Sequence, residues 1–205
     1  MLKCREMTSG YIITLADPAQ LPKLIQGKFL NGHHQARIAF VGRSNVGKSS
    51  LINCLMKERV ARVSATPGKT RAIHFFLWKE ADRIIADLPG YGFAKVAKED
   101  KREWSKLLDS YFSADDHVEL VMMLFDSRHG PTEADLEALD YFISKKKTVQ
   151  VIMTKFDQLK TQSERHHRKQ DVQKILAEYG IPPEHLYWVS TKDQKSLEWL
   201  RRPFL

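Results

Sequence analysis

The stretch RIAFVGRSNVGKSS, residues 37–50, places a glycine-rich turn directly after a short apolar run. Gly42 and Gly47 bracket four residues, and Lys48 and Ser49 follow, which fits the pattern G-x-x-x-x-G-K-[ST]. Such glycines let the backbone turn tightly and approach a ligand, and the turn presents N–H groups to anionic oxygens. The stretch therefore predicts a phosphate-binding loop between a strand and a helix, with Lys48 reaching the β- and γ-phosphates and Ser49 ligating magnesium.

Strand-like and helix-like segments alternate along the rest of the chain. Strands are expected at 37–41, 72–78, 83–87, 118–126, 148–154 and 186–190, and helices at 48–57, 98–112, 132–144, 162–179 and 195–204. The alternation predicts an α/β fold with a mostly parallel sheet, helices on both faces and ligands at the carboxyl ends of the strands. The second and third strands are close enough in sequence to form a hairpin.

Length and composition favour one domain. The chain has 205 residues and is 42% hydrophobic, without an apolar run long enough to span a membrane. Residues 1–35 contain prolines and a turn signal, and we expect an irregular extension packing on a domain at 36–205. The first residues lack the apolar stretch of a signal peptide, which predicts a cytoplasmic protein whose Cys4 and Cys54 are free thiols.

Two short motifs follow predicted strands and complete a nucleotide site. In DLPG, residues 87–90, Asp87 is placed to hold magnesium through water, and the Gly90 N–H can meet a γ-phosphate. In TKFD, residues 154–157, the Asp157 carboxylate can accept two hydrogen bonds from guanine, whereas adenine offers no such donor pair. The Lys155 stem would lie along the purine face. Asp157 therefore predicts selection of GTP over ATP.

Three other segments have an open assignment between a functional and a structural role. The backbone of Ser190 and Thr191 could meet guanine O6, or the pair could cap a helix. The segment 59–71 is either a flexible loop or a first switch in which Thr70 closes on magnesium when GTP is bound. The segment 90–100 would then be the second switch.

Together, GRSNVGKSS, TPGKT, DLPGYGFA and TKFD resemble the EngB family of bacterial GTPases, in the class that also holds Era and EngA. The resemblance runs from about residue 20 to the C-terminus. It implies a three-layer P-loop G domain with one antiparallel strand, GTP hydrolysis with magnesium, and roles in large ribosomal subunit assembly and in cell division and septation. The last loop, STKDQKSLEWL, departs from the family because it lacks the usual glycine.

The family pattern carries over to individual positions of this chain. Magnesium ligands are Ser49 and Thr70, and the residues expected to act in catalysis are Lys48, Thr70 and Asn45. The implied GTP contacts are Gly42, Arg43, Ser44, Asn45, Val46, Gly47, Lys48, Ser49, Gly68, Lys69, Thr70, Arg71, Ala72, Asp87, Leu88, Pro89, Gly90, Thr154, Lys155, Phe156, Asp157, Val189, Ser190 and Thr191.

The catalytic step differs from that of many small GTPases. Tyr91 stands where those enzymes place a glutamine that orients the attacking water, so we expect a low intrinsic rate or a partner that completes the site. In related GTPases an asparagine at the position of Asn45 helps hold potassium beside the phosphates. Asn45 is either such a residue or an ordinary turn asparagine.

The chain carries a formal net charge of +8, which indicates either a polyanionic partner or a solvated basic surface. Basic residues gather at 145–147, 164–169 and 201–202. The resemblance favours ribosomal RNA of a large-subunit precursor as the partner, and we expect the protein to be a monomer. The alternative is a GTP-dependent protein-interaction module at the septum that binds no RNA. A P-loop kinase is a third possibility, against which TKFD argues.

Overall fold

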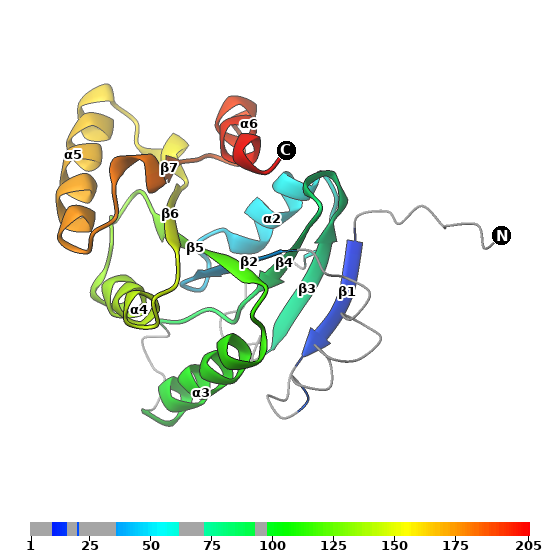
Figure 1. Cartoon of the computed structure of the whole chain (residues 1–205). Helices are drawn as coiled ribbons and strands as arrows, with labels where there is room; N and C mark the ends of the chain where they lie inside the picture. Colours follow the sequence, from blue (N-terminus) through cyan, green and yellow to red (C-terminus); the bar gives the residue numbers. More distant parts are fainter. Residues whose placement is uncertain (1–9, 16–19, 21–35, 62–71, 93–97) are drawn as a thin grey trace.

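A seven-stranded sheet runs through the centre of the molecule (Figure 1). This computed structural model describes residues 10–15, 20, 36–61, 72–92 and 98–205. The strands are β1 (Gly10–Leu15), β2 (Arg37–Gly42), β3 (Ile73–Trp78), β4 (Arg83–Asp87), β5 (Val118–Asp126), β6 (Val149–Thr154) and β7 (Leu186–Trp188). Their order across the sheet is β1-β3-β4-β2-β5-β6-β7.

The sheet is mostly parallel, as the alternation predicts. Strands β4, β2, β5, β6 and β7 pair in parallel, whereas β3 runs antiparallel to both of its neighbours, β1 and β4. The expected hairpin at 72–87 is therefore present, and among the described strands β3 alone has the reversed direction. The predicted fold class is confirmed.

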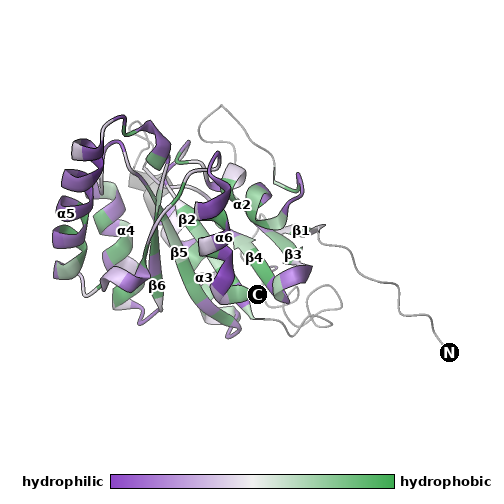
Figure 2. Ribbon diagram, turned by 90° about the horizontal axis from the view of Figure 1, so that it is seen from above, coloured by the Kyte–Doolittle hydropathy of each residue, from purple (hydrophilic) through white to green (hydrophobic). Residues whose placement is uncertain are grey.

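Helices cover both faces of the sheet and separate the core into two parts. They are α2 (Lys48–Met56), α3 (Lys98–Ala114), α4 (Glu133–Ser144), α5 (Gln162–Glu178) and α6 (Gln194–Arg201). Buried side chains of α3, α4 and α5 pack on one face of the sheet, and those of α2 and α6 pack on the other. Figure 2 shows hydrophobic residues concentrated in the strands between the two helix layers, with hydrophilic residues on the outer faces of the helices.

Four predicted helices match the structure to within two residues at each end, because the signals at their ends are local, whereas α6 ends at Arg201, three residues before the predicted end, and a 3-10 helix follows at Arg202–Phe204. Asp135 accepts hydrogen bonds from the backbone N–H and the hydroxyl of Thr132, 2.9 and 2.7 Å away, at the start of α4. Thr161 and Glu164 cap α5 reciprocally. Gly180, with φ of +72°, follows the end of α5.

Strand β1 corrects the expectation that residues 1–35 are irregular throughout. Residues 10–15 pair with β3 at the edge of the sheet, and Thr14 bonds His74 across the pair at 2.6 Å. The partner strand lies about 60 residues further along the chain, so the pairing leaves no local signal beyond a β-rich composition. Cys4 lies outside the described residues, and Cys54 is a free thiol on α2.

Among the helices that the structure describes, none combines the length and the apolar character that crossing a membrane requires.

Candidate functional site

The predicted motifs lie together at one edge of the sheet. Residues 42–49 follow β2, residues 87–90 follow β4, residues 154–157 follow β6 and residues 189–191 follow β7. These strands run in parallel, so their carboxyl ends lie side by side, which is where parallel α/β sheets bind ligands. Ala72 lies at the same edge, because it precedes β3 and His74 of that antiparallel strand pairs with Asp87.

The glycine loop depends on its glycines for two different reasons. At Gly42 a Cβ atom would lie 2.9 Å from the carbonyl oxygen of Leu124, so glycine allows β2 to pass closely by β5. Gly47 has φ of +104°, a left-handed conformation that side chains rarely adopt. Asn45 has φ of +63°, which asparagine tolerates better than most residues. The turn then enters α2, whose N-terminus adds a positive dipole.

Lys48 and Asp87 join the glycine loop to the end of β4. The Lys48 ammonium donates hydrogen bonds to the Asp87 carboxylate and, at 2.7 Å, to the Leu88 carbonyl oxygen. Asp87 is only 5% exposed. Ser49 is half-buried in the first turn of α2. A cation of the phosphate loop is therefore bonded to a carboxylate of the neighbouring strand, and Ser49 follows that cation in the chain.

The DLPG segment packs directly against the glycine loop. The backbones of Arg43 and Tyr91 form a parallel bridge, and the Tyr91 N–H lies 3.4 Å from the carbonyl oxygen of Gly42. A Cβ atom on Gly90 would lie 3.1 Å from the same oxygen. Trp104 of α3 donates its indole N–H to the Pro89 carbonyl at 2.9 Å. The segment is therefore held between the phosphate loop and α3.

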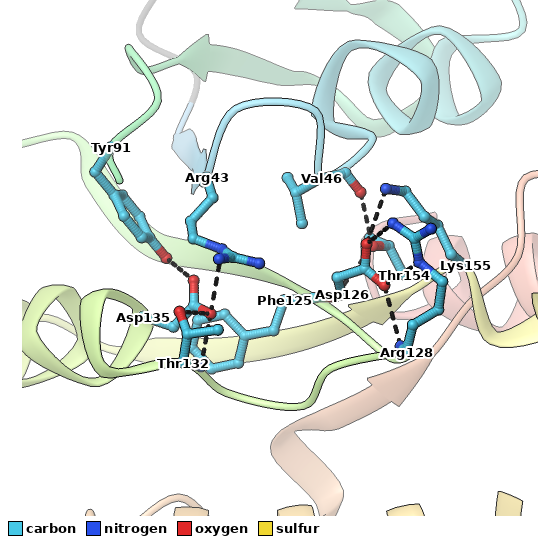
Figure 3. Close-up of polar contacts among 10 residues, drawn as sticks. All are labelled: Arg43, Val46, Tyr91, Phe125, Asp126, Arg128, Thr132, Asp135, Thr154 and Lys155. Carbon is cyan, nitrogen blue, oxygen red and sulfur yellow. Dashed lines mark hydrogen bonds and ion pairs between the residues drawn. The ribbon is translucent and has the colours of Figure 1, made fainter. Parts of the chain in front are cut away.

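The Tyr91 side chain points away from the glycine loop into the α3–α4 layer (Figure 3). It is buried, its ring makes an edge contact with Trp104, and its hydroxyl donates to Asp135 Oδ1 at 2.9 Å. Asp135 is fully buried and its other oxygen lies 3.5 Å from Nε of Arg43. Burial, together with the Asp135 carboxylate, raises the pKa of Tyr91 well above its ordinary value, so the hydroxyl keeps its proton.

The TKFD segment is tied to the opposite side of the glycine loop (Figure 3). The Thr154 hydroxyl donates to the carbonyl oxygens of Val46, at 2.7 Å, and Phe125, at 3.0 Å. The Lys155 ammonium donates to the carbonyl oxygen of Asn45 at 2.7 Å. The base motif and the phosphate motif, more than 100 residues apart in sequence, are thus one connected unit.

Asp157 and the last loop meet as the order of motifs predicts. The Ser190 hydroxyl donates to Asp157 Oδ1 at 2.8 Å, and the Lys192 ammonium lies 3.2 Å from Oδ2. Burial alone would raise the pKa of Asp157, but these two partners hold it below its ordinary value. The carboxylate is therefore ionised at neutral pH and its side chain is 29% exposed, so it can accept hydrogen bonds from a ligand.

The alternative role of Ser190 and Thr191 as a helix cap is wrong. Asp193 caps α6 instead, accepting the Lys195 N–H at 3.2 Å. Val189 is buried, and its carbonyl oxygen accepts the backbone N–H of Phe156. The loop at 189–191 is thus held against TKFD.

Some predicted residues lie outside the described residues, and some observed ones have no sequence signal. The first group holds Gly68, Lys69, Thr70 and Arg71 of the first switch and positions 93–97 of the second. The second group holds Asp126 at the end of β5, which bonds Lys155, Asp135 in the first turn of α4, which bonds Tyr91, and Arg128, which bonds Asp126. Asp126 could have been noticed in the sequence only because it stands at the end of a predicted strand.

The basic clusters do not form one surface. Arg201 is 4% exposed and is paired with Glu80, which removes it from the expected basic surface. Lys145 is bound to Asp109 at 2.8 Å, just before β6 begins, at the sheet edge opposite the motifs. The first half of α5 lies at the motif edge, because Arg168 donates hydrogen bonds to the carbonyl oxygens of Arg128 and His129.

Comparison with known proteins relates this site to GTPases. Residues 37–155 match the family model described as "50S ribosome-binding GTPase". A Thermotoga maritima protein described as a probable GTP-binding protein EngB is 40% identical over 146 residues, 71% of this chain and 74% of that protein. A Clostridium botulinum protein of the same description, from strain Alaska E43, is 37% identical over 195 residues, 94% of this chain and 91% of that protein.

Solved structures agree with these matches. A crystal structure of a probable GTP-binding protein EngB aligns with a TM-score of 0.63 at 27% identity, over 82% of this chain and 95% of that chain. Era from Aquifex aeolicus with GDP·AlF4⁻ bound has a TM-score of 0.62 at 22% identity, over 82% of this chain and 55% of that chain. The second likeness concerns the fold alone.

Proposed function

Because this chain belongs to the EngB family of GTP-binding, GTP-hydrolysing proteins, we propose that it acts as a GTP-dependent switch in assembly of the large ribosomal subunit. We further propose that it is cytoplasmic, monomeric, and needed for normal cell division and septation. The observation that carries the proposal is the meeting of the phosphate loop, DLPG and TKFD at one sheet edge, within a family model described as ribosome-binding.

In the proposed complex, each motif holds a different part of GTP. The turn at 42–47 and the N-terminus of α2 surround the phosphates, and Lys48 neutralises the β- and γ-phosphates. Asp157 accepts the guanine N1–H and amino group, while the Lys155 stem covers one face of the purine. Gly90 meets the γ-phosphate and passes its presence or loss to the segment that follows.

The donors at the phosphate end suit magnesium. Ser49 and Asp87 offer a hydroxyl and a carboxylate oxygen, the hard ligands that magnesium prefers, and Asp87 is nearly buried beside Lys48. We assign Ser49 as a direct ligand, Thr70 as a second one, and Asp87 as a ligand through water. Bound magnesium would offset the charge of the phosphate oxygens.

Potassium is the proposed aid to hydrolysis, since Tyr91 does not supply the group that a glutamine would. We expect GTP turnover about tenfold faster in potassium chloride than in sodium chloride, because a cation beside the phosphates stabilises transition-state charge. In Asn45→Gly the left-handed turn is kept while the side-chain amide is lost, so the difference between the two salts should disappear. Equal turnover of the unmodified protein in both salts would contradict the proposal.

Contact with ribosomal RNA is proposed for the side of α5 next to TKFD. His166, His167 and Lys169 are exposed on α5, and Lys169 lies above the rings of Phe156 and Trp188. A basic surface adjoining the nucleotide loop could bind phosphates and sense the nucleotide together. The cluster at 145–147, at the other edge of the sheet, lacks this connection.

Co-sedimentation with large-subunit particles tests the proposed partner. We expect binding with a non-hydrolysable GTP analogue, at least tenfold weaker binding with GDP, and loss of binding as salt rises, since phosphate contacts release counterions. Equal recovery in both nucleotide states would contradict a switch. Recovery with division proteins and without ribosomal particles would favour the septum module instead.

A further inference from the structure

Asp126 is a buried carboxylate at the end of β5 that none of the recognised motifs includes. It is 3% exposed, and Arg128 donates to it three times: through the backbone N–H at 3.0 Å, through Nε at 2.9 Å and through Nη2 at 2.6 Å. Its Oδ2 also accepts a hydrogen bond from the Lys155 ammonium at 2.8 Å. Figure 3 shows these groups converging beneath the glycine loop.

Lys155 is held at its far end by two acceptors. Its ammonium lies between Asp126 Oδ2 and the carbonyl oxygen of Asn45, which is 2.7 Å away. A free lysine side chain has about 2 kcal/mol of rotamer entropy. Because both acceptors hold the ammonium in one place, they restrict the path of the stem that leads to it. Its backbone has φ of +56°, so the residue turns the chain from β6 toward Asp157.

The charges around Asp126 favour its ionised form. Burial alone would raise its pKa, but the hydrogen bonds from Arg128 and Lys155 outweigh burial and hold the pKa well below the ordinary value. The Arg128 side chain is 41% exposed, and its guanidinium occupies the outer side of the carboxylate. Lys155 is 23% exposed and occupies the inner side, next to the glycine loop.

We propose that Asp126 is a positioning residue for guanine recognition, which holds the Lys155 ammonium so that the stem lines the purine position beside Asp157. The inference rests on the proposed assignment of residues 154–157 to the guanine base. Asp126 does not touch the nucleotide in this account. Its charge places Lys155, and it does so from β5, a strand that carries no nucleotide motif.

Asp126→Asn tests the proposal, because the amide keeps the shape but loses the charge that attracts Lys155. We expect the dissociation constant for GDP and the KM for GTP to rise about tenfold, with kcat at saturating GTP unchanged, since the γ-phosphate site is untouched. A fall in kcat as well would show a general loosening of the site and would overturn the positioning role. Unchanged dissociation constant and KM would overturn the proposal.

A double-mutant cycle separates positioning from a purely structural role. In a Lys155→Met background, Asp126→Asn should change GDP affinity by less than about twofold, because the group that Asp126 positions is already gone. Additive losses would overturn the proposal. Arg128→Gln is the matched control: it removes the outer cation but leaves Asp126 and Lys155 in contact, so GDP affinity should stay within about twofold.

Two further measurements check that the variants fold and that residues 154–157 bind the guanine base. Circular dichroism melting shows whether each variant folds. If Asp126→Asn does not fold, Asp126→Glu is the second variant. It retains the charge but displaces it by one methylene, so it should weaken GDP binding in the same way, and unchanged affinity would overturn the proposal.

If the unmodified protein showed no preference for GDP over ADP, the assignment of TKFD to the guanine base would fail. A selective protein with an unaffected Asp126→Asn variant would contradict only the role of Asp126.

Discussion

Replacing Asp157 with asparagine is expected to change the preferred base from guanine to xanthine. Asparagine cannot accept both guanine donors, because its amide nitrogen faces the 2-amino group, so GDP affinity should fall about 100-fold. Xanthine carries a carbonyl oxygen at that position, which accepts a hydrogen bond from the new amide. Displacement of a fluorescent guanine nucleotide by GDP and by xanthosine diphosphate measures the change.

Asp193→Asn is the matched control for that experiment. Asp193 is another carboxylate of the same region, but it caps α6 and is bonded to Lys195 rather than facing the proposed base. Its replacement should leave the preference for GDP intact. An Asp157→Asn variant that still bound GDP far more tightly than xanthosine diphosphate would contradict the assignment of the base site. The amide oxygen can still accept the Ser190 hydroxyl, so the loop should stay in place.

Replacing Tyr91 with glutamine is expected to destabilise the protein without accelerating hydrolysis. The side chain at this position is buried against Trp104 and bonded to Asp135, away from the glycine loop. Glutamine would lose the ring packing, and we expect the free energy of unfolding to fall by about 2 kcal/mol. Denaturant unfolding and GTP turnover of the same preparation measure the two effects.

Tyr91→Phe keeps the ring and removes only the hydroxyl, so it separates packing from hydrogen bonding. Asp135 would retain Thr132 and Arg43 as partners, and the loss should be about 1 kcal/mol. Faster GTP turnover in Tyr91→Gln at unchanged stability would contradict the observed geometry, because it would require residue 91 to face the nucleotide.

The sequence predicts where Tyr91 stands relative to the nucleotide motifs, but not where its side chain points. Its position after Gly90 raises the question of catalysis, but the direction of its side chain depends on α3 and α4, which no local pattern specifies. Similarly, the doublet at 201–202 reads as a basic surface, yet Arg201 is buried beside Glu80, 121 residues away. The sequence shows which side chains are charged, but not which of them form ion pairs in the folded protein.

Residues close together in the chain decided the strand–turn–helix unit around Lys48, the strand–helix alternation, the helix caps and the carboxylate of TKFD. These features depend on backbone conformation and side-chain chemistry within a few positions, so the sequence alone determines them. The tertiary structure alone decided that β1 joins β3, that Tyr91 turns toward Asp135, and that Asp126 holds Lys155. Those contacts join segments 29 or more positions apart, and they exist only because the order of strands in the sheet brings the segments together.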